Sequence, residues 1–226
     1  MSEETFSNTN QTSFDSERSL GDFLKWRFTR KEPKATQIET SDQWKQLGEQ
    51  SRNYTVWIGH STFLLNNGDL TILTDPIFSK RASPFSWAGP KRLISPAIPL
   101  DELPDIDVVT VSHNHYDHLD IESLKTLQKL NPNALFLVAK GDKDLLVRSG
   151  IKNVKEFHWW EDLEVKNTLF IFTPVQHWSA RGFRDRNKSL WGGWFIQSSN
   201  RSIYHAGDTG YSDDFKETKS RLGSPD

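Results

Sequence analysis

Three histidines and one aspartate fall within six residues near the middle of the chain: His113, His115, Asp117 and His118. Imidazole nitrogens and carboxylate oxygens at this density are typical ligands of zinc and other transition metals. His113 and His115 lie two positions apart in an extended loop and can point at one ion. Asp117 and His118 follow the bend before a predicted helix and can point at a neighbouring ion. The spacing therefore favours two adjacent metal sites over a polar loop in which Asp117 only caps the helix.

Other polar residues also follow predicted strands. His177 comes after the strand 169–172, and Asp208 comes after the strand 202–204 in a Gly-Asp-Thr-Gly turn. The flanking glycines let the Asp208 carboxylate project freely. Asp75 ends a further strand, directly before a proline, where an aspartate can also simply cap a turn. Taken singly, each of these residues also fits an ordinary loop or turn.

The elements that position these residues can be read from hydrophobic patterning. Short β-prone runs alternate with two amphipathic stretches, and Asn66–Asp69 has the composition of a hairpin turn. Residues 75–104 hold six of the ten prolines and predict a long ordered loop. This order predicts an α/β or α+β domain with two sheets. The expected strands are 54–58, 63–65, 70–73, 107–111, 134–139, 169–172, 190–197 and 202–204, and the expected helices are 121–130, 141–148 and 213–221.

The amino-acid composition limits which binding partners and which cellular compartment are expected. The 226 residues carry 28 Lys and Arg against 30 Asp and Glu, so the net charge is -2 and there is no global positive field for nucleic acid. With no cysteine, the chain has no disulfide and no thiolate ligand, which fits a reducing compartment. No stretch approaches the ~18 apolar residues of a membrane span, and the N-terminus lacks the features of a secretory signal. We expect a cytoplasmic protein.

The chain divides into a tail and one domain. Residues 1–19 are polar without an apolar period and predict a disordered tail, followed by a domain over 20–226. The aromatic and basic segment 23–28 can lie at a membrane interface or pack on its own domain. Residues 41–50 predict a short polar helix or a linker. Nine tryptophans and 14 phenylalanines indicate a ring-filled core or an apolar substrate surface.

The motif at 113–118 reads His-Asn-His-Tyr-Asp-His and resembles the His-x-His-x-Asp-His signature of the metallo-β-lactamase superfamily. Further superfamily elements appear in the expected order. More narrowly, the chain is similar to the branch of phospholipases D that hydrolyse N-acylphosphatidylethanolamine, from about residue 20 to residue 226. The segments that carry these resemblances are 57–62, 74–76, 81–84, 89–92, 159–161, 176–179, 187–191 and 205–210.

The resemblance implies a four-layer αβ/βα sandwich with two metals, usually zinc, at one edge. It places His113, His115 and His177 on the first metal, Asp117 and His118 on the second, and Asp208 between both. Asp117 and Asp208 would be the catalytic residues. The family also has a later histidine on its second metal, but no histidine follows His205. We therefore expect a domain that is incomplete at its C-terminus, with one ligand missing from the second site.

The resemblance also implies an activity. Two metals would lower the pKa of bound water from ~15.7 to ~7 for attack on a phosphodiester. The substrate would be an N-acylated ethanolamine phospholipid, cleaved to phosphatidic acid and an N-acylethanolamine. Peripheral membrane contact and a homodimer are compatible with this activity. The alternatives are another hydrolase of the superfamily, such as a lactonase or a nuclease, and a non-catalytic metal-binding fragment. The net charge of -2 speaks against the nuclease.

Residues around the expected ligands have two interpretations each. Tyr116 would contact the substrate headgroup or belong to the core. Asp75 and His60 would support ligand side chains through hydrogen bonds, or else serve as a turn cap and a structural histidine. His158 and His205 are expected to be structural.

Overall fold

The computed structural model describes residues 5–10, 41, 43–46 and 53–226, together with residues 21, 25 and 29. Most of the expected tail 1–19, and the segment 23–28 apart from Lys25, lie outside the described residues. Within residues 5–10, the backbone N–H of Phe6 donates to the carbonyl of Asn187 at 2.8 Å, and the division into a tail and one domain stays a prediction. Within 41–50, residues 44–46 are helical.

Six strands form the first sheet, in the order β1-β2-β3-β4-β5-β6. The first three strands are antiparallel, and β3 to β6 run parallel. Helix α3 (Ile121–Leu130) connects β4 to β5, and helix α4 (Lys143–Arg148) connects β5 to β6. The strands are β1 (Asn53–Gly59), β2 (Thr62–Asn67), β3 (Thr71–Thr74), β4 (Val108–Thr110), β5 (Leu135–Ala139) and β6 (Val154–Phe157).

The second sheet has four antiparallel strands in the order β10-β9-β8-β7. They are β7 (Asp162–Val165), β8 (Thr168–Thr173), β9 (Gly193–Ser198) and β10 (Ser202–His205), and helix α5 (Asp214–Leu222) follows them. Because β8 and β10 are both antiparallel to β9, they run in the same direction and their carboxyl ends meet at one edge.

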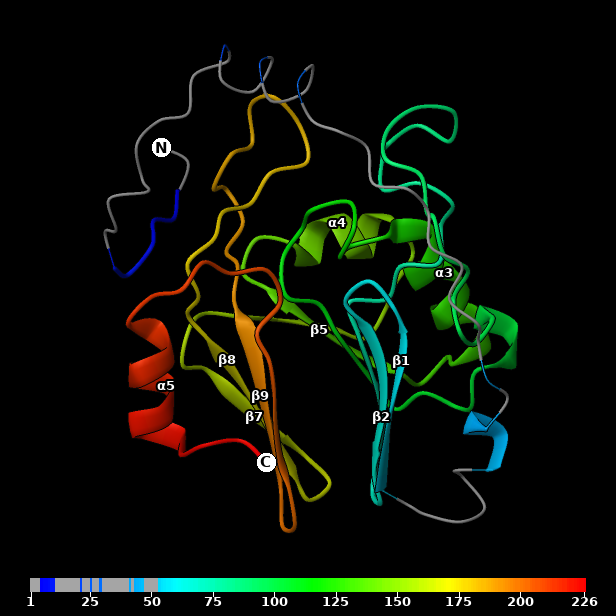
Figure 1. Ribbon diagram of the computed structural model, residues 1–226, viewed down its shortest axis with the longest axis vertical. Helices are drawn as coiled ribbons and strands as arrows, with labels where there is room; N and C mark the ends of the chain where they lie inside the picture. The colour runs from blue at the N-terminus through cyan, green and yellow to red at the C-terminus, as the bar shows by residue number, and fades with distance from the viewer. Residues whose placement is uncertain are drawn as a thin grey trace.

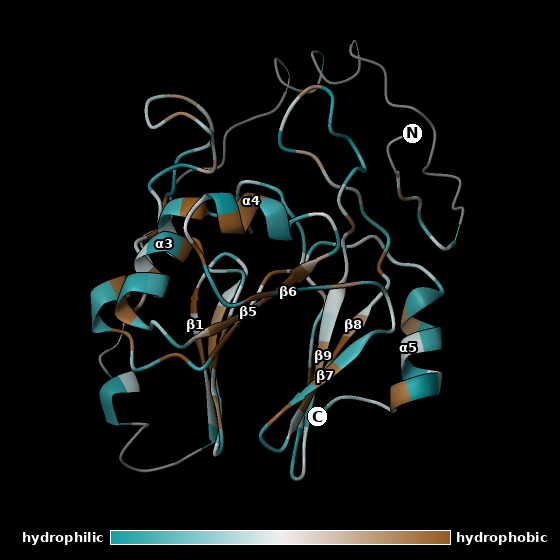
Figure 2. Cartoon of the chain, turned by 180° about the vertical axis from the view of Figure 1, so that it is seen from behind, coloured by the Kyte–Doolittle hydropathy of each residue, from teal (hydrophilic) through white to brown (hydrophobic). Residues whose placement is uncertain are grey.

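The two sheets face each other, and the helices cover their outer faces (Figure 1). Alternate residues of one strand serve two different cores. Val109 packs with Leu124 of α3 on the helix side, whereas Val108 packs with Phe170 and Trp194 between the sheets. Hydropathy follows this layering, since brown gathers on the strands and the helices carry much teal (Figure 2). These layers confirm the predicted αβ/βα sandwich.

Hydrophobic patterning in the sequence predicts some of these elements and not others. The predicted helix 121–130 is α3 with the same bounds, and the proline-rich stretch is a long connection with a single 3₁₀ turn at Leu100–Glu102. The sequence reading missed β6 and β7, which are short and carry charged, exposed residues. Among the helices that the structure describes, none is long and apolar enough to cross a membrane.

Candidate metal centre

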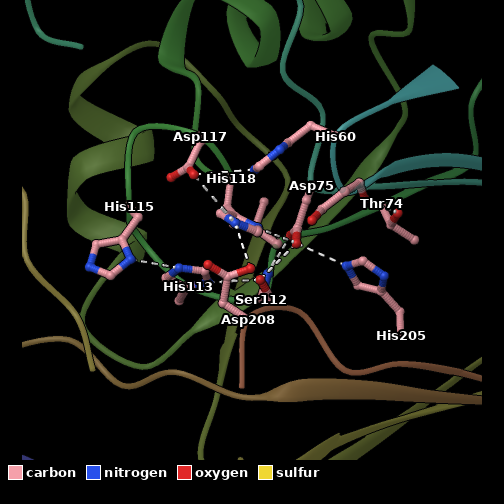
Figure 3. A network of polar contacts seen from close by, with 12 residues as sticks. His60, Thr74, Asp75, Ser112, His113, His115, Asp117, His118, His205 and Asp208 are labelled. Atoms are coloured by element: carbon pink, nitrogen blue, oxygen red, sulfur yellow. Dashed lines mark hydrogen bonds and ion pairs between the residues drawn. The ribbon is translucent and has the colours of Figure 1, made fainter. Parts of the chain in front are cut away.

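Among the expected ligands, His113, His115, Asp117, His118 and Asp208 point toward one another (Figure 3), and His177 lies beside His115. The parallel strands β3 and β4 end there, which brings Asp75 beside the loop 112–118. From the second sheet, the segment after β8 supplies His177 and the segment after β10 supplies Asp208. Ligands at the carboxyl ends of neighbouring strands are a common arrangement in α/β sheets. Here two sheets contribute to one site.

Three imidazoles form the first group. The Nδ1 atom of His115 lies 2.8 Å from Nε2 of His113 and 3.2 Å from Nε2 of His177. Burial, together with the neighbouring imidazoles, lowers the pKa of His113 well below its usual value and that of His177 to about 4. Burial also lowers the pKa of His115. All three rings are therefore neutral at pH 7, which is the protonation state that a metal ligand requires.

The second group is built from carboxylates and an imidazole. Nε2 of His118 lies 3.2 Å from Oδ1 of Asp208 and 3.9 Å from Oδ2 of Asp117. The other oxygen of Asp208, Oδ2, lies 4.0 Å from Nε2 of His177. Asp208 thus faces both groups, one oxygen to each.

The carboxylates of this second group are ionised at neutral pH. Burial alone would raise the pKa of Asp117, but a hydrogen bond from His60 and the nearby His118 outweigh it and lower the pKa to about 2. For Asp208, the hydrogen bond from His118 is the main cause of a lowered pKa. The two charges create a negative potential that attracts cations.

Asp75 links the buried sides of both groups. One of its oxygens accepts the backbone N–H of Ser112 at 2.6 Å. The other accepts the Ser112 hydroxyl at 2.7 Å, Nδ1 of His118 at 2.8 Å and Nε2 of His205 at 2.9 Å. Burial opposes ionisation, but His205 and His118 outweigh it and hold the pKa of Asp75 far below its ordinary value. Asp75 therefore stays a carboxylate although its side chain is fully buried.

These contacts orient the ligand nitrogens. Nδ1 of His113 lies 2.9 Å from the Ser112 hydroxyl, which itself donates to Asp75. With Nδ1 of His113 and of His118 engaged on this side, both Nε2 atoms are left facing the centre, as in metal sites whose histidines are held by carboxylates. The contact of Asp75 with His118 is compatible with the supporting role predicted for Asp75, and Ser112, directly before the motif, is a further member that residue type alone does not indicate. The sequence reading treated His205 as structural, although the ring closes the same network.

The donor set fits a pair of cations. The three imidazoles can share hydrogen bonds at 2.8–3.2 Å, and the same convergence of ring nitrogens could hold a cation. In the second group, burial opposes protonation of His118, but hydrogen bonds to Asp208 and Asp75 outweigh it and raise the pKa of His118 to about 10. The carboxylates that draw a proton to His118 would draw a cation equally. Candidate cation-binding groups among the described residues are His113–His115–His177, His60–Asp117–His118 and His113–His118–Asp208.

Tyr116 holds the loop rather than projecting freely from it. Its hydroxyl donates to the carbonyl of Arg181 at 3.0 Å, and the Arg181 guanidinium lies 4.0 Å from the centre of its ring. Arg181 in turn donates to the carbonyls of Asn114 and Leu119 at 2.8 Å each. This arginine braces the ligand loop from outside, a role that its isolated position in the sequence does not reveal. Contact of Tyr116 with a substrate headgroup stays a prediction.

A cavity of about 690 Å³ opens beside the second group. His60 and Asp117 stand at its border, and its lining includes Trp44, Val56 and Ile77. Most of its wall is apolar, and Lys91 and Arg92 also line it.

Comparison with known proteins agrees with this fold. The family described as "Beta-lactamase superfamily domain" matches residues 71–226, and the chain belongs to this family. The chain is 41% identical over 184 residues to N-acyl-phosphatidylethanolamine-hydrolyzing phospholipase D 1 of Caenorhabditis elegans, covering 77% of this chain and 52% of the relative. It is also 41% identical over 183 residues to the mitochondrial N-acyl-phosphatidylethanolamine-hydrolyzing phospholipase D of Saccharomyces cerevisiae, covering 78% and 38%.

Among solved structures, a protein described as a possible metal-dependent hydrolase from Veillonella parvula aligns with a TM-score of 0.60 at 21% identity. The alignment covers 75% of this chain and 68% of that protein, and it supports the fold. The chain spans about half or less of the length of the two phospholipase relatives. What those relatives do as whole proteins is therefore a hypothesis for this chain.

Proposed function

We propose that this chain is a metal-dependent hydrolase, or the part of one that holds its metal centre, and that it cleaves N-acylphosphatidylethanolamine-type phospholipids. The observation that carries the proposal is the position of Asp208, with one oxygen toward His177 and the other toward His118. A carboxylate between two groups of ligands is what a two-metal phosphodiesterase requires. The names of the relatives that are 41% identical support the lipid substrate.

The proposed cofactor is a pair of zinc ions. His113, His115 and His177 would hold one ion, Asp117 and His118 would hold the other, and Asp208 would contact both. When bound, such ions polarise phosphoryl oxygens and make water acidic enough to attack at neutral pH. Imidazole and carboxylate ligands are typical of zinc sites, which supports this choice.

The side chains of the chain itself do the positioning. Asp117 is ionised at neutral pH and borders the cavity, so it can orient an attacking water. Asp75 and Ser112 fix the orientation of His113 and His118. The apolar cavity beside Asp117 would take an acyl chain and bring the phosphodiester to the ligand loop. Peripheral contact with a membrane would deliver such a substrate.

The test is hydrolysis by the purified chain supplied with Zn²⁺. Vesicles containing N-acylphosphatidylethanolamine are incubated with the protein, and N-acylethanolamine and phosphatidic acid are measured by mass spectrometry. We expect both products in equal amounts, with rates at least about a hundredfold lower for His177→Ala, which removes a ligand of the first group. His158→Ala is the matched control, because His158 lies outside the three candidate ligand groups.

Other outcomes would redirect the assignment. Efficient cleavage of a soluble lactone or of RNA without lipid products would replace the phospholipase by another hydrolase of the family. Zinc binding without turnover of any of these substrates would indicate a metal-binding fragment.

A further inference from the structure

The segment 5–10 lies against the backbone of His177, although it is far in sequence from every residue of the metal centre. Its burial alternates: Phe6, Asn8 and Asn10 are half-buried, and the residues between them are exposed. In an extended segment every second side chain points to the same face, so these three side chains face the domain. Figure 1 shows the segment in blue, near the start of α5.

Contacts at both ends hold this segment in place. Phe6 packs against the core between the two sheets, in addition to its backbone hydrogen bond. At the other end, the Thr9 hydroxyl and the side-chain amide of Asn10, at 2.8 Å, donate to Asp214 at the start of α5. The Asp214 side chain belongs to a buried residue, so it is a fixed anchor. The two sets of contacts determine where Asn8 lies between them.

Asn8 accepts two hydrogen bonds with one oxygen. Its Oδ1 accepts the backbone N–H of His177 at 3.1 Å and the indole N–H of Trp191 at 3.1 Å. The same indole N–H also donates to the carbonyl of Val175 at 3.0 Å, two residues before His177. Trp191 is fully buried, so its position is fixed by the core. Asn8 therefore connects the backbone of His177 to a rigid part of the domain.

The backbone next to His177 is also held from the other side. The N–H of Gly210 donates to the carbonyl of Gln176 at 2.8 Å, in the turn that carries Asp208. His177 thus projects from a backbone that lies between the Asp208 turn and Asn8. A shift of this backbone would move the His177 imidazole relative to the other two rings of its group.

We propose that Asn8 is a positioning residue of the metal centre and that it acts through the backbone N–H of His177. The inference rests on the proposed function only in taking His177 as a ligand of the first cation. Asn8 lies outside residues 71–226, which the family matches, so membership of the family does not by itself predict this contact. Loss of its oxygen would deprive the His177 N–H of this acceptor, which is costly in a partly buried place.

The first test is hydrogen exchange of single backbone amides, followed by NMR in the metal-free full chain. Asn8→Ala removes the acceptor, whereas Asn8→Asp keeps an accepting oxygen in a side chain of the same shape. We expect the His177 amide to exchange at least about tenfold faster in Asn8→Ala, and at nearly the wild-type rate in Asn8→Asp. Ser7→Ala is the matched control, because Ser7 is an exposed neighbour of Asn8, and it should match the wild type.

The amides of β9 separate a local effect from a loss of stability. They should exchange equally in all these proteins. Exchange that is accelerated to the same extent in β9 and at His177 would mean that Asn8 acts on the whole domain, and the positioning role would be wrong.

The second test is the affinity for zinc, which a contact that only stabilises the fold would not change in folded protein. Zn²⁺ is titrated into the metal-free full chain by calorimetry, and the binding step that depends on His177 is identified by its loss in His177→Ala. We expect this step to be at least about tenfold weaker in Asn8→Ala. Asn8→Asp and Ser7→Ala should bind zinc at least as tightly as the wild type. Equal affinity in Asn8→Ala and the wild type would overturn the proposal.

A measurement on the wild type does not require any variant to fold. The His177 amide must be protected from exchange in the metal-free wild type, although it lies in a loop, and an unprotected amide would also overturn the proposal. These results are separable from the hydrolysis test. Faster exchange and weaker zinc binding in Asn8→Ala would support the positioning role even if no N-acylethanolamine were released. Lipid hydrolysis with zinc affinity unchanged in Asn8→Ala would remove that role and leave the proposed function in place.

Discussion

Asp75 is the residue on which the chemistry of the neighbouring side chains depends. It accepts two hydrogen bonds from Ser112 and one each from His118 and His205, while its own backbone has a φ of 36°. A buried carboxylate is costly unless its oxygens are well paired. Here the pairing also orients the rings of His113 and His118, so that their Nε2 atoms face the proposed metal centre.

Asp142 is a second buried carboxyl group. Its surroundings raise its pKa, whereas those of Asp75 lower the pKa of that residue. Asp142 precedes α4, and the side chain of Asn114 donates to it at 3.2 Å. Burial outweighs hydrogen bonds from Ser189 and Asn114 and raises the pKa of Asp142 to about 7. In the unfolded chain an aspartate ionises near ~3.9. Between these two values the folded state binds more protons, so this residue makes stability fall as pH rises from about 4 to about 7.

The variant Asp142→Asn keeps the shape of the side chain and removes the ionisation. We expect equal stability of the variant and the wild type at pH 4, and a variant more stable by about 1–4 kcal/mol at pH 8. Urea unfolding at several pH values measures this, and the difference between the two curves isolates Asp142 from the histidines. A difference that does not change with pH would show that Asp142 is already ionised in the folded protein at low pH.

At the scale of elements, the turn after β10 sets how closely Asp208 approaches the ligand loop. Gly207 has a φ of 62°, and a Cβ there would lie 2.6 Å from the Cβ of Ser112. Any larger residue would push the turn that carries Asp208 away from the first sheet. The glycine before Asp208 is therefore required by close approach as well as by backbone conformation.

Gly207→Ala tests this contact. We expect a loss of about 2–4 kcal/mol in the free energy of unfolding, from backbone strain and overpacking together, and zinc affinity reduced at least tenfold. Gly150→Ala is the matched control, because Gly150 also has a positive φ, 93°, but has nothing within 4 Å of an added Cβ. It should lose only about 1–2 kcal/mol and bind zinc normally. Equal zinc affinity in the two variants would mean that Asp208 tolerates the displacement.

Most of the helices and strands are predictable from the local sequence. Their apolar residues either alternate as in a strand or recur with the period of a helix. Helix α3 and the hairpin of β2 and β3 are examples. The loop 112–118 is recognisable because it holds three histidines and an aspartate within six residues. Strands β6 and β7 are not predictable in this way, because their exposed charged positions hide the apolar alternation. The network around Asp75 joins residues up to 130 positions apart, and only the tertiary fold brings His205 to it.

At the scale of the whole molecule, the site depends on the packing of two sheets. The loop 112–118 belongs to the first sheet, whereas His177 and Asp208 belong to the second. Trp194 of β9 is fully buried between the sheets, and its indole N–H donates to the carbonyl of Val111 at 3.0 Å, two residues before His113. Aromatic packing thus fixes the distance between the two halves of the ligand set. A cation bound by both halves would in turn hold the sheets together.

Metal removal should therefore lower the stability of the whole domain. A ligand that binds only the folded state at a hundred times its Kd stabilises by about 2.7 kcal/mol. For a chain of this size that corresponds to a Tm roughly 5–11 °C higher with zinc than with a chelator. Calorimetry of the wild type in both conditions measures the shift, which should be largely lost in His177→Ala and kept in His158→Ala. If the wild-type Tm were the same with zinc and with the chelator although zinc is shown to bind, zinc would bind the unfolded chain as tightly as the folded one, and the prediction would be wrong.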